Sequence, residues 1–231
     1  MIQNHKKVVV MSLGGSLIVP EEIDLDFLRK FREVIKKNSK NYKFIIVCGG
    51  GSVARKYISA LRNEGKSEYL QNMAGIAVTR LNARFLAYFF GKDPEFGIPH
   101  DMKHAASLLK KNDVVFCGAL RYAPNQTSDA TSAHLANYFG ADFINLTNVK
   151  GLYDKNPKEH KDAKFIPEIT REGLAKIVFS VPQKPGMHAP VDHVAMKIIR
   201  EHQIKTYIIG KDTKQLNNLL KGKSFIGTKI D

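Results

Sequence analysis

The sequence has no long hydrophobic run, little cysteine and fewer acidic than basic residues. No apolar stretch approaches the roughly 18 residues that a membrane span needs. The only two cysteines, Cys48 and Cys117, both follow apolar runs, so we expect buried, reduced thiols rather than a disulfide framework. The N-terminal stretch MIQNHKK is not followed by a signal-peptide pattern. We therefore expect a cytoplasmic protein without a membrane partner.

The charge balance is strongly basic. The chain has 36 Lys and Arg residues against 22 Asp and Glu residues, a net charge of +14. Such an excess can indicate a nucleic-acid partner. Here, however, the basic residues are spread from end to end, and aromatic residues do not alternate with them. We do not expect nucleic acid as a partner, and a lysine-rich surface also suits a protein whose ligands are polyphosphates.

The apolar pattern predicts an α/β fold. With 231 residues, 43% of them hydrophobic, the chain can form one α/β domain or two small lobes. Short runs that are apolar on both faces, typical of buried parallel strands, occur at 7–12, 43–48, 113–117, 142–146 and 205–209. Helical patterns occur at 24–37, 52–63, 68–90, 102–111, 129–139, 190–202 and 213–221. This alternation predicts a parallel sheet with helices on both faces, and the irregular part, 147–190, predicts hairpins and loops.

Two glycine corners follow predicted strands. The first is SLGGSLIVP at 12–20, and the second is CGGGSVARKY at 48–57. Glycine allows unusual backbone angles and close approach of a ligand, and ligands of open α/β sheets bind beyond the carboxyl ends of the strands. Neither corner matches G-x-G-x-x-G or the P-loop pattern. The pair predicts a shared site for a polyphosphate, although a structural turn is the alternative for either corner alone.

Three later segments combine small polar residues with a carboxylate or a glycine turn. NQTSDATSAHLA at 125–136 predicts either an N-cap at Ser128 or Asp129, or a phosphate site with a carboxylate for a metal. LTNVKGLYDKNP at 146–157 contains a glycine turn that is also compatible with a simple hairpin. In PGMHAPVDHVAMKII at 185–199, Asp192 falls in the first turn of a predicted helix, where it favours the helix dipole whatever else it does.

The ordered set of these segments, together with GIAVTRLNA at 75–83, resembles the amino acid kinase family, and within it the uridylate (UMP) kinases of archaeal type. The resemblance covers nearly the whole chain. It implies a single three-layer α/β/α sandwich around a mostly parallel sheet. The N-terminal half, about residues 1–140, would hold the acceptor UMP, and the C-terminal half, about residues 141–231, would hold ATP.

The same resemblance implies an activity, transfer of the ATP γ-phosphoryl group to UMP in pyrimidine nucleotide biosynthesis, with Mg²⁺, possible inhibition by UTP and a homohexameric assembly. UMP contacts are implied for Gly50, Asn72, Thr127 and Ser128. ATP contacts are implied for Gly15, Ser16, Gly51, Arg55, Thr147, Asn148, Tyr153 and Asn156. The implied catalytic residues are Arg55, Asp129 and Asp192, of which the two aspartates would hold the metal.

The chain departs from the family pattern at several positions, which keeps two alternatives open. Asn72 stands where the family has an acidic residue for the UMP ribose, Asn156 replaces an aspartate, and the 118–129 loop is longer. The first alternative is a related phosphotransferase with another acceptor, such as isopentenyl phosphate. The second is a non-catalytic nucleotide-binding regulator.

The many apolar residues of 68–90 exceed what one buried face needs and predict a contact between subunits.

Overall fold

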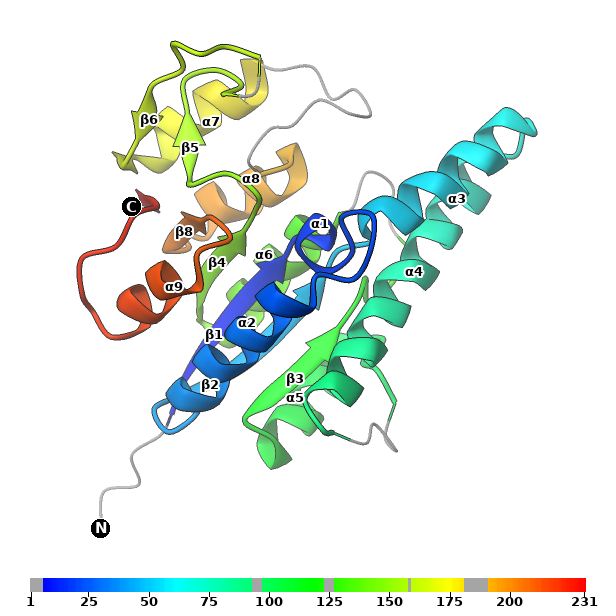
Figure 1. Ribbon diagram of the computed structural model, residues 1–231, viewed down its shortest axis with the longest axis horizontal. Coiled ribbons are helices and arrows are strands. Elements are labelled where there is room, and N and C mark those ends of the chain that lie inside the picture. The colour runs from blue at the N-terminus through cyan, green and yellow to red at the C-terminus, as the bar shows by residue number, and fades with distance from the viewer. Residues whose placement is uncertain (1–5, 93–96, 123–126, 158, 181–190) are drawn as a thin grey trace.

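A seven-stranded sheet forms the centre of the structure, a computed structural model that describes residues 6–92, 97–122, 127–157, 159–180 and 191–231 (Figure 1). The strand order is β3-β2-β1-β4-β8-β9-β7. Parallel pairing joins β1 (Lys7–Leu13) to β2 (Tyr42–Cys48) and to β4 (Asp142–Leu146). It also joins β2 to β3 (Val114–Cys117) and β4 to β8 (Thr206–Ile209). These are the five predicted strands, and their parallel pairing confirms the predicted fold class.

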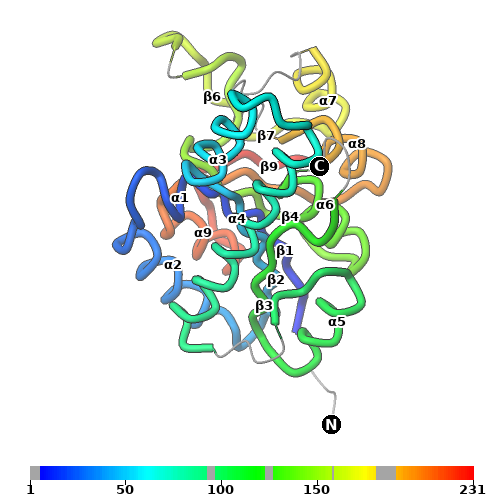
Figure 2. Tube along the Cα trace, turned by 90° about the vertical axis from the view of Figure 1, so that its right-hand side faces the viewer, coloured from blue at the N-terminus to red at the C-terminus, as the bar shows by residue number. Residues whose placement is uncertain are grey.

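Helices cover both faces of the sheet (Figure 2). On one side lie α2 (Leu25–Asn38), α4 (Glu68–Phe89) and α9 (Thr213–Leu220). On the other lie α5 (Met102–Lys111), α6 (Ser128–Phe139) and α8 (His193–Glu201). The short α1 (Gly15–Ile18) and the longer α3 (Gly51–Asn63) directly follow the two glycine corners. The three layers predicted by the resemblance are therefore present.

The core follows from strands that are apolar on both faces and helices that are apolar on one. In α2 the buried residues Phe27, Leu28, Phe31 and Ile35 recur at helical spacing, which gives the helix one face for the sheet. Asp24 begins this helix as its N-cap, because its carboxylate accepts a hydrogen bond of 3.0 Å from the amide of Phe27.

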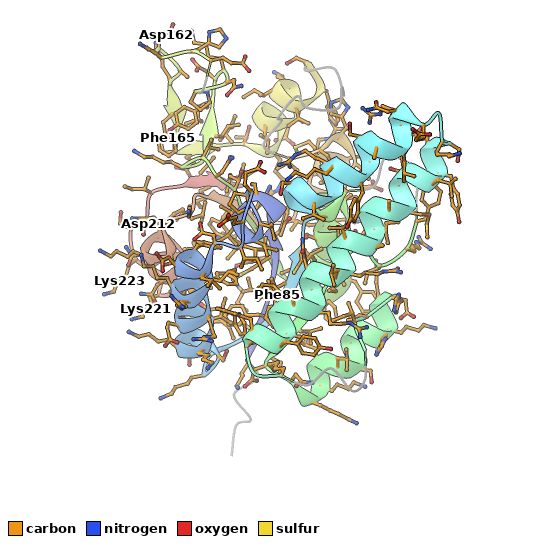
Figure 3. All side chains as sticks on the ribbon, turned by 45° about the vertical axis from the view of Figure 1, so that its right-hand side comes forward. Phe85, Asp162, Phe165, Asp212, Lys221 and Lys223 are labelled. Carbon is orange, nitrogen blue, oxygen red and sulfur yellow. The ribbon has the colours of Figure 1, made fainter. Side chains whose placement is uncertain are left out.

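The prediction for 147–190 is correct in one part and wrong in another. A hairpin is present, because β5 (Leu152–Tyr153) pairs antiparallel with β6 (Phe165–Ile166). Figure 3 places Asp162 at the outer end of this hairpin. The segment also contains β7 (Glu168–Ile169) and α7 (Arg171–Ser180), which were predicted as loop. Residues 181–190 lie outside the described residues, and the predicted helix 190–202 begins later, at His193.

The chain terminus adds a strand that was not predicted. The strand β9 (Thr228–Ile230) pairs antiparallel with β8 and parallel with β7, so it continues the sheet beyond the predicted strands. Its three residues are too few for a periodic signal.

The prediction of unbridged thiols is confirmed, because Cys48 and Cys117 are both free and buried. Within the described ranges, every helix is too short or too polar to traverse a bilayer.

Candidate functional site

The two glycine corners touch each other through their backbones. A Cβ atom added to Gly15 would lie 2.0 Å from the amide nitrogen of Gly51 and 2.7 Å from the carbonyl carbon of Gly49. A Cβ added to Gly49 would lie 2.5 Å from the amide nitrogen of Gly15. No side chain fits between backbones this close, which explains why the sequence has glycines here. The expected adjacency of the two corners is therefore confirmed.

Hydrogen bonds fix both corners to the ends of parallel strands. The amide of Gly49 donates to the carbonyl of Leu13 at 2.9 Å, and the amide of Gly14 donates to the carbonyl of Leu146 at 3.1 Å. These bonds continue the ladders of β1 with β2 and β4 beyond the strand ends. Gly51 has a φ of +65°, in the left-handed region that favours glycine. This conformation lets the chain turn from β2 directly into α3, where the amide of Ser52 donates to the carbonyl of Val19 at 3.3 Å and so joins the two corners.

Arg55 lies one turn into α3 with its side chain exposed. Among the described residues it makes no hydrogen bond and no ion pair. The next residue, Lys56, differs, because its ammonium group lies 3.2 Å from the carboxylate of Glu21. A guanidinium that no protein carboxylate neutralises, next to a helix N-terminus, is suited to binding an anion.

Asn82 in α4 holds the second corner from behind. Its side-chain amide donates a buried hydrogen bond of 2.8 Å to the carbonyl of Gly49. Asn82 itself is only 6% exposed. A buried carbonyl needs a donor, so Asn82 fixes the orientation of the peptide group at which β2 turns into α3. This residue belongs to the TRLNA motif, whose presence was noted in the sequence but whose role was not predicted.

Two further residues of the motif, Thr79 and Arg80, hold the segment after β3. The hydroxyl of Thr79 accepts a hydrogen bond of 3.0 Å from the amide of Ala119. The guanidinium of Arg80 donates to the carbonyls of Ala119 at 3.0 Å and Leu120 at 2.8 Å. One stretch of α4 therefore positions both the glycine corner and the start of the 118–129 loop. We call Thr79, Arg80 and Asn82 the α4 clamp.

Asp129 lies in the first turn of α6, and Thr127, not Ser128 or Asp129, is the N-cap. The hydroxyl of Thr127 accepts hydrogen bonds from the amides of Asp129 at 3.1 Å and Ala130 at 3.4 Å. The N-cap alternative considered for Asp129 is therefore wrong, because Thr127 has taken that position. The carboxylate of Asp129 is left to interact with the sheet, where the hydroxyl of Ser12 donates to it at 2.7 Å.

Asp129 and Asp192 form a pair of neighbouring carboxylates. Burial, and next the negative charge of Asp192, raise the pKa of Asp129 to about 7, against the lowering effect of hydrogen bonds from Ser12 and Asn145. Asp192 is the N-cap of α8, accepting from the amides of Val194 at 2.8 Å and Ala195 at 2.9 Å. It also accepts a hydrogen bond from the hydroxyl of Thr127.

The carboxylate pair fits a hard divalent cation. After burial, the negative charge of Asp192 is the second cause of the raised pKa of Asp129, and a cation bound by both carboxylates would offset that repulsion. Mg²⁺ takes oxygen ligands and is usually held by one or two carboxylates together with substrate phosphates rather than by an all-protein cage. No group of three or more His, Cys, Asp or Glu side chains suited to a metal occurs among the described residues.

Ser12 and Asn145 are site residues that the sequence reasoning missed. They are register partners on the neighbouring strands β1 and β4, and both are almost fully buried. Each is a polar residue within an otherwise apolar strand, in KVVVMSL and DFINL. That shared exception was visible in the sequence, because a polar side chain buried in a strand needs a partner, and here Asp129 is that partner for both.

The predicted acceptor-side residues lie on α4 and α6. Asn72 is partly buried on α4, and no hydrogen bond to its side chain is formed by another described residue. It lies seven residues before Thr79, on the same face of the helix and about 10 Å along the axis. Ser128 begins α6, and its carbonyl accepts a hydrogen bond of 2.8 Å from the hydroxyl of Ser132. Ser16, which was predicted to contact ATP instead, is partly buried in α1, after the first corner.

The predicted ATP-side residues divide into two places. Thr147 and Asn148 directly follow β4, and Leu146, the last residue of that strand, is bonded to Gly14, so both lie at the same sheet edge as the glycine corners. Tyr153 belongs to the β5–β6 hairpin and packs edge to face on Phe165, with ring centroids 5.6 Å apart. The side chain of Asn156 donates to Glu159 at 2.6 Å.

The parallel sheet, with two contacting glycine corners at its strand ends, defines an α/β protein whose geometry suits an anionic ligand at the sheet edge. The chain belongs to the amino acid kinase family, whose sequence model matches residues 7–210. The uridylate kinase of Thermococcus kodakarensis is 36% identical over 217 residues, covering 93% of this chain and 96% of that relative. The uridylate kinase of Methanobrevibacter smithii is 33% identical over 224 residues, covering 96% and 98%.

A solved structure is similar over nearly the same length. The crystal structure of the uridylate kinase from Archaeoglobus fulgidus matches with a TM-score of 0.83 at 36% identity, covering 97% of this chain and all of that one (100%). The family resemblance of the quoted motifs and the predicted three-layer fold are thus both confirmed.

Proposed function

We propose that this protein is a UMP kinase that transfers the γ-phosphoryl group of ATP to UMP and releases UDP and ADP. The observation that carries the proposal is the contact between the two glycine corners, close to Arg55, which has no ion pair among the described residues. Two phosphate-bearing substrates need one place where their phosphates meet, and a corner without side chains gives their oxygens access to backbone amides. The similarity to uridylate kinases over more than nine-tenths of the chain supports UMP as the acceptor.

The two substrates would approach this place from opposite halves of the chain. UMP would lie over β2, β3 and the first turns of α4 and α6, in contact with Gly50, Asn72, Thr127 and Ser128. ATP would lie over β4 and the β5–β6 hairpin. Its contacts would be Gly15, Ser16, Gly51, Arg55, Thr147, Asn148, Tyr153 and Asn156. The acceptor half would then be about residues 1–140 and the donor half about 141–231, with the phosphates of ATP also reaching Gly15, Ser16, Gly51 and Arg55 of the acceptor half.

The chemistry needs alignment and charge neutralisation more than covalent help. The phosphate of UMP is already a nucleophile, so no general base is required, and the protein has to hold it in line with the γ-phosphate. The guanidinium of Arg55 and the amides at the start of α3 would bind the phosphoryl oxygens on which negative charge develops. The α4 clamp would keep these amides in place during the transfer, since Asn82 fixes the peptide group that precedes them.

Asp129 and Asp192 would hold Mg²⁺ in this proposal. When bound, the ion neutralises charge on the phosphates of ATP and on the transferring group. Ser12 and Asn145 act as positioning residues, because their hydrogen bonds orient the carboxylate of Asp129. Thr127 has the same effect on Asp192, to which its hydroxyl donates.

The decisive experiment is an ADP-release assay with a panel of acceptors, namely UMP, CMP, dUMP, isopentenyl phosphate and carbamate. UMP is expected to give the highest kcat/KM by at least tenfold. A higher value for another acceptor would assign the chain to a related phosphotransferase, an alternative that the neutral amide of Asn72 motivates. No turnover with any acceptor, in a protein that still binds ATP, would indicate a non-catalytic regulator. Addition of UTP to the same assay tests feedback inhibition.

We further propose that copies of this chain associate through α3 and α4, as part of a hexamer. These two helices lie side by side and extend beyond the sheet (Figure 1). Their exposed large apolar residues are Tyr57, Tyr69, Leu70, Leu81 and Tyr88. Light scattering of Leu81→Ser and Tyr88→Ser variants tests the contact, and an unchanged mass with both substitutions present would contradict it.

A further inference from the structure

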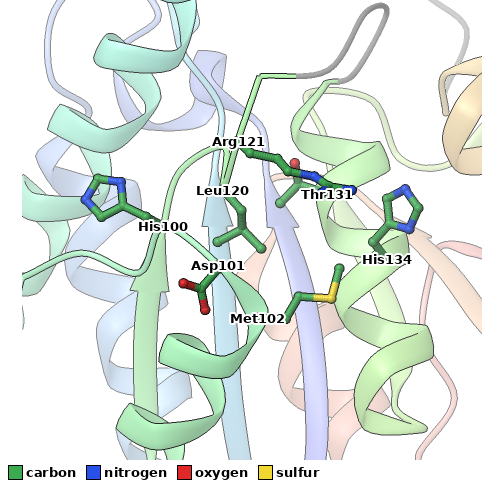
Figure 4. Close-up of a pocket in the computed structure, with 7 residues that line it drawn as sticks. All are labelled: His100, Asp101, Met102, Leu120, Arg121, Thr131 and His134. Carbon is green, nitrogen blue, oxygen red and sulfur yellow. The ribbon is translucent and has the colours of Figure 1, made fainter.

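A small pocket between α6 and the beginning of α5 takes no part in the proposed transfer (Figure 4). Its volume is about 170 Å³, and it is lined by His100, Asp101, Met102, Leu120, Arg121, Thr131 and His134. Binding sites for drug-sized ligands and cofactors measure about 300–1,000 Å³. The pocket is too small for a nucleotide, but it has room for a compact anion or a few water molecules.

One polar group in this pocket is buried without a partner. Thr131 is 1% exposed, and its hydroxyl has no hydrogen-bond partner among the residues that the structure describes. Figure 4 shows the side chain of Arg121 extending from the loop after β3 toward α6, the helix that carries Thr131 and His134. Within the described ranges, Arg121 makes neither a hydrogen bond nor an ion pair. An exposed arginine without a partner is common, whereas a buried hydroxyl without one is rare. Together in one pocket they are suited to an oxygen-rich anionic ligand.

The surroundings of Arg121 favour an anion over a cation. Burial, and next the charge of Arg121, lower the pKa of His134, so this imidazole is neutral near pH 7 and can act as a hydrogen-bond donor. The carboxylate of Asp101 is already engaged at the other end of the pocket, where it caps α5 by accepting a hydrogen bond of 2.7 Å from the amide of His104. Asp101 keeps its negative charge, but of the two charged side chains in the lining only Arg121 acts on the pKa of His134, so the positive charge lies on the α6 side of the pocket.

We propose that this pocket is a second ligand site that binds a small phosphate-type oxyanion through Arg121, Thr131 and His134. The inference does not depend on which acceptor the enzyme phosphorylates. Leu120 and Arg121 belong to the segment whose carbonyls the α4 clamp holds, and this segment leads to Asp129. An anion in the pocket consequently stabilises the base of the 118–129 loop, which gives it a means of influencing the acceptor side.

Calorimetry with inorganic phosphate, at constant ionic strength set with chloride, tests the proposal. Arg121→Gln is expected to weaken binding at this site by about tenfold or more, the loss typical of one charge-assisted hydrogen bond. Thr131→Val, which keeps the shape of the side chain, is expected to weaken it by about threefold or more. Lys103→Gln removes an exposed cation on α5 outside the pocket and should change nothing. Thermal unfolding of each variant checks that the fold is intact.

The Arg55→Ala variant distinguishes phosphate binding in this pocket from phosphate binding at the glycine corners. Phosphate binding that persists in Arg55→Ala and is lost in Arg121→Gln supports the proposal. The opposite pattern, or the absence of saturable binding, or equal binding by Lys103→Gln and Arg121→Gln variants, would overturn it and identify an adventitious ion only. Repeating the titration with glycerol phosphate distinguishes free phosphate from the phosphate group of a larger molecule, since the monoester needs a wider opening.

Discussion

At the scale of single residues, the basic side chains around the glycine corners differ in whether a carboxylate neutralises them. Lys56 pairs with Glu21, and Lys211 pairs with Asp24, whereas Arg55 has no such partner among the described residues. Lys211 comes shortly after β8, which ends at the same sheet edge as β4, and is a second cation near the strand ends. Its ion pair, which also lowers the pKa of Asp24, makes it a less available cation than Arg55.

The first prediction follows from this difference. Arg55→Ala is expected to lower kcat by about 10²-fold or more, the loss typical of removing one group that stabilises developing charge. The melting temperature should stay within about 2 °C, because an exposed side chain without partners adds little to stability. The matched control is Lys56→Ala, whose exposed ion pair contributes at most about 1 kcal/mol. Steady-state kinetics with UMP and ATP, and thermal unfolding, measure both effects. A large loss of stability with normal kinetics would mean that Arg55 has a structural role instead of a catalytic one.

At the scale of elements, α4 is the helix that connects the fold to the site. Its clamp residues reach the second glycine corner and the loop after β3, two segments that come from different strands. The helix was predicted from its apolar pattern, but a pattern of burial does not reveal which loops a polar side chain will meet. Exposed and buried apolar residues also mix on this helix, since Leu81 is 61% exposed while Leu86 is fully buried.

The second prediction concerns the clamp. Asn82→Ala would leave the carbonyl of Gly49 buried without its donor, at a cost of about 1–3 kcal/mol in the free energy of unfolding. The KM for both substrates should rise as well, because the peptide group before the α3 amides loses its fixed orientation. Arg84→Ala is the control, an exposed position on the same helix. Urea unfolding and steady-state kinetics are the measurements. Equal results for the two variants would contradict the role of Asn82 in fixing the glycine corner.

The third prediction concerns the contact of the glycine corners. Gly15→Ala is expected to destabilise the protein by about 3 kcal/mol or more, because the new methyl group overlaps backbone atoms that cannot move aside. Gly75→Ala is the control within α4. There the added Cβ meets only the end of the Ile58 side chain, at 3.2 Å, and alanine gains helix propensity. Urea unfolding compares the two, and a mild effect of Gly15→Ala would show that the corners separate easily.

At the scale of the whole molecule, the sequence predicted the central parallel strands and most helices correctly, but it missed short elements in the C-terminal half. Five strands and the order of the helices followed from apolar runs long enough to carry a period. The short strands β7 and β9 carry no such signal, and α7 was missed because prolines on both sides of it suggested loop. The glycine corners could be paired in advance, since parallel strands end at one edge. The partners of Asp129 could not be predicted, because Ser12, Asn145 and Asp129 lie on three different elements and come together only in the folded chain.

The fourth prediction is a dependence of stability on pH that originates at the carboxylate pair. The pKa of Asp129 is about 7 in the folded protein, raised from its ordinary value of 3.8. The folded state therefore favours the protonated carboxyl. Its contribution to stability is fully present below about pH 4 and is lost progressively as the pH rises through 7. Asp129→Asn keeps the neutral form at every pH and so does not lose this contribution.

Thermal unfolding from pH 4.5 to 8.5, in EDTA and without nucleotide, measures the effect. Asp129→Asn should match the wild type near pH 4.5 and become more stable than it by about 1–2 kcal/mol at pH 8, after allowance for the partial exposure of the group. For a domain of this size the difference corresponds to several degrees in melting temperature, at about 2–4 °C per kcal/mol.

The same variant should lose most of its turnover, because an amide is a poorer ligand for Mg²⁺ than a carboxylate. Asp26→Asn, an exposed carboxylate on α2, should show no such divergence. Parallel pH curves for wild type and Asp129→Asn would mean that the charges of Asp129 and Asp192 are compensated in solution, which would leave the carboxylate pair without its reason to bind a cation.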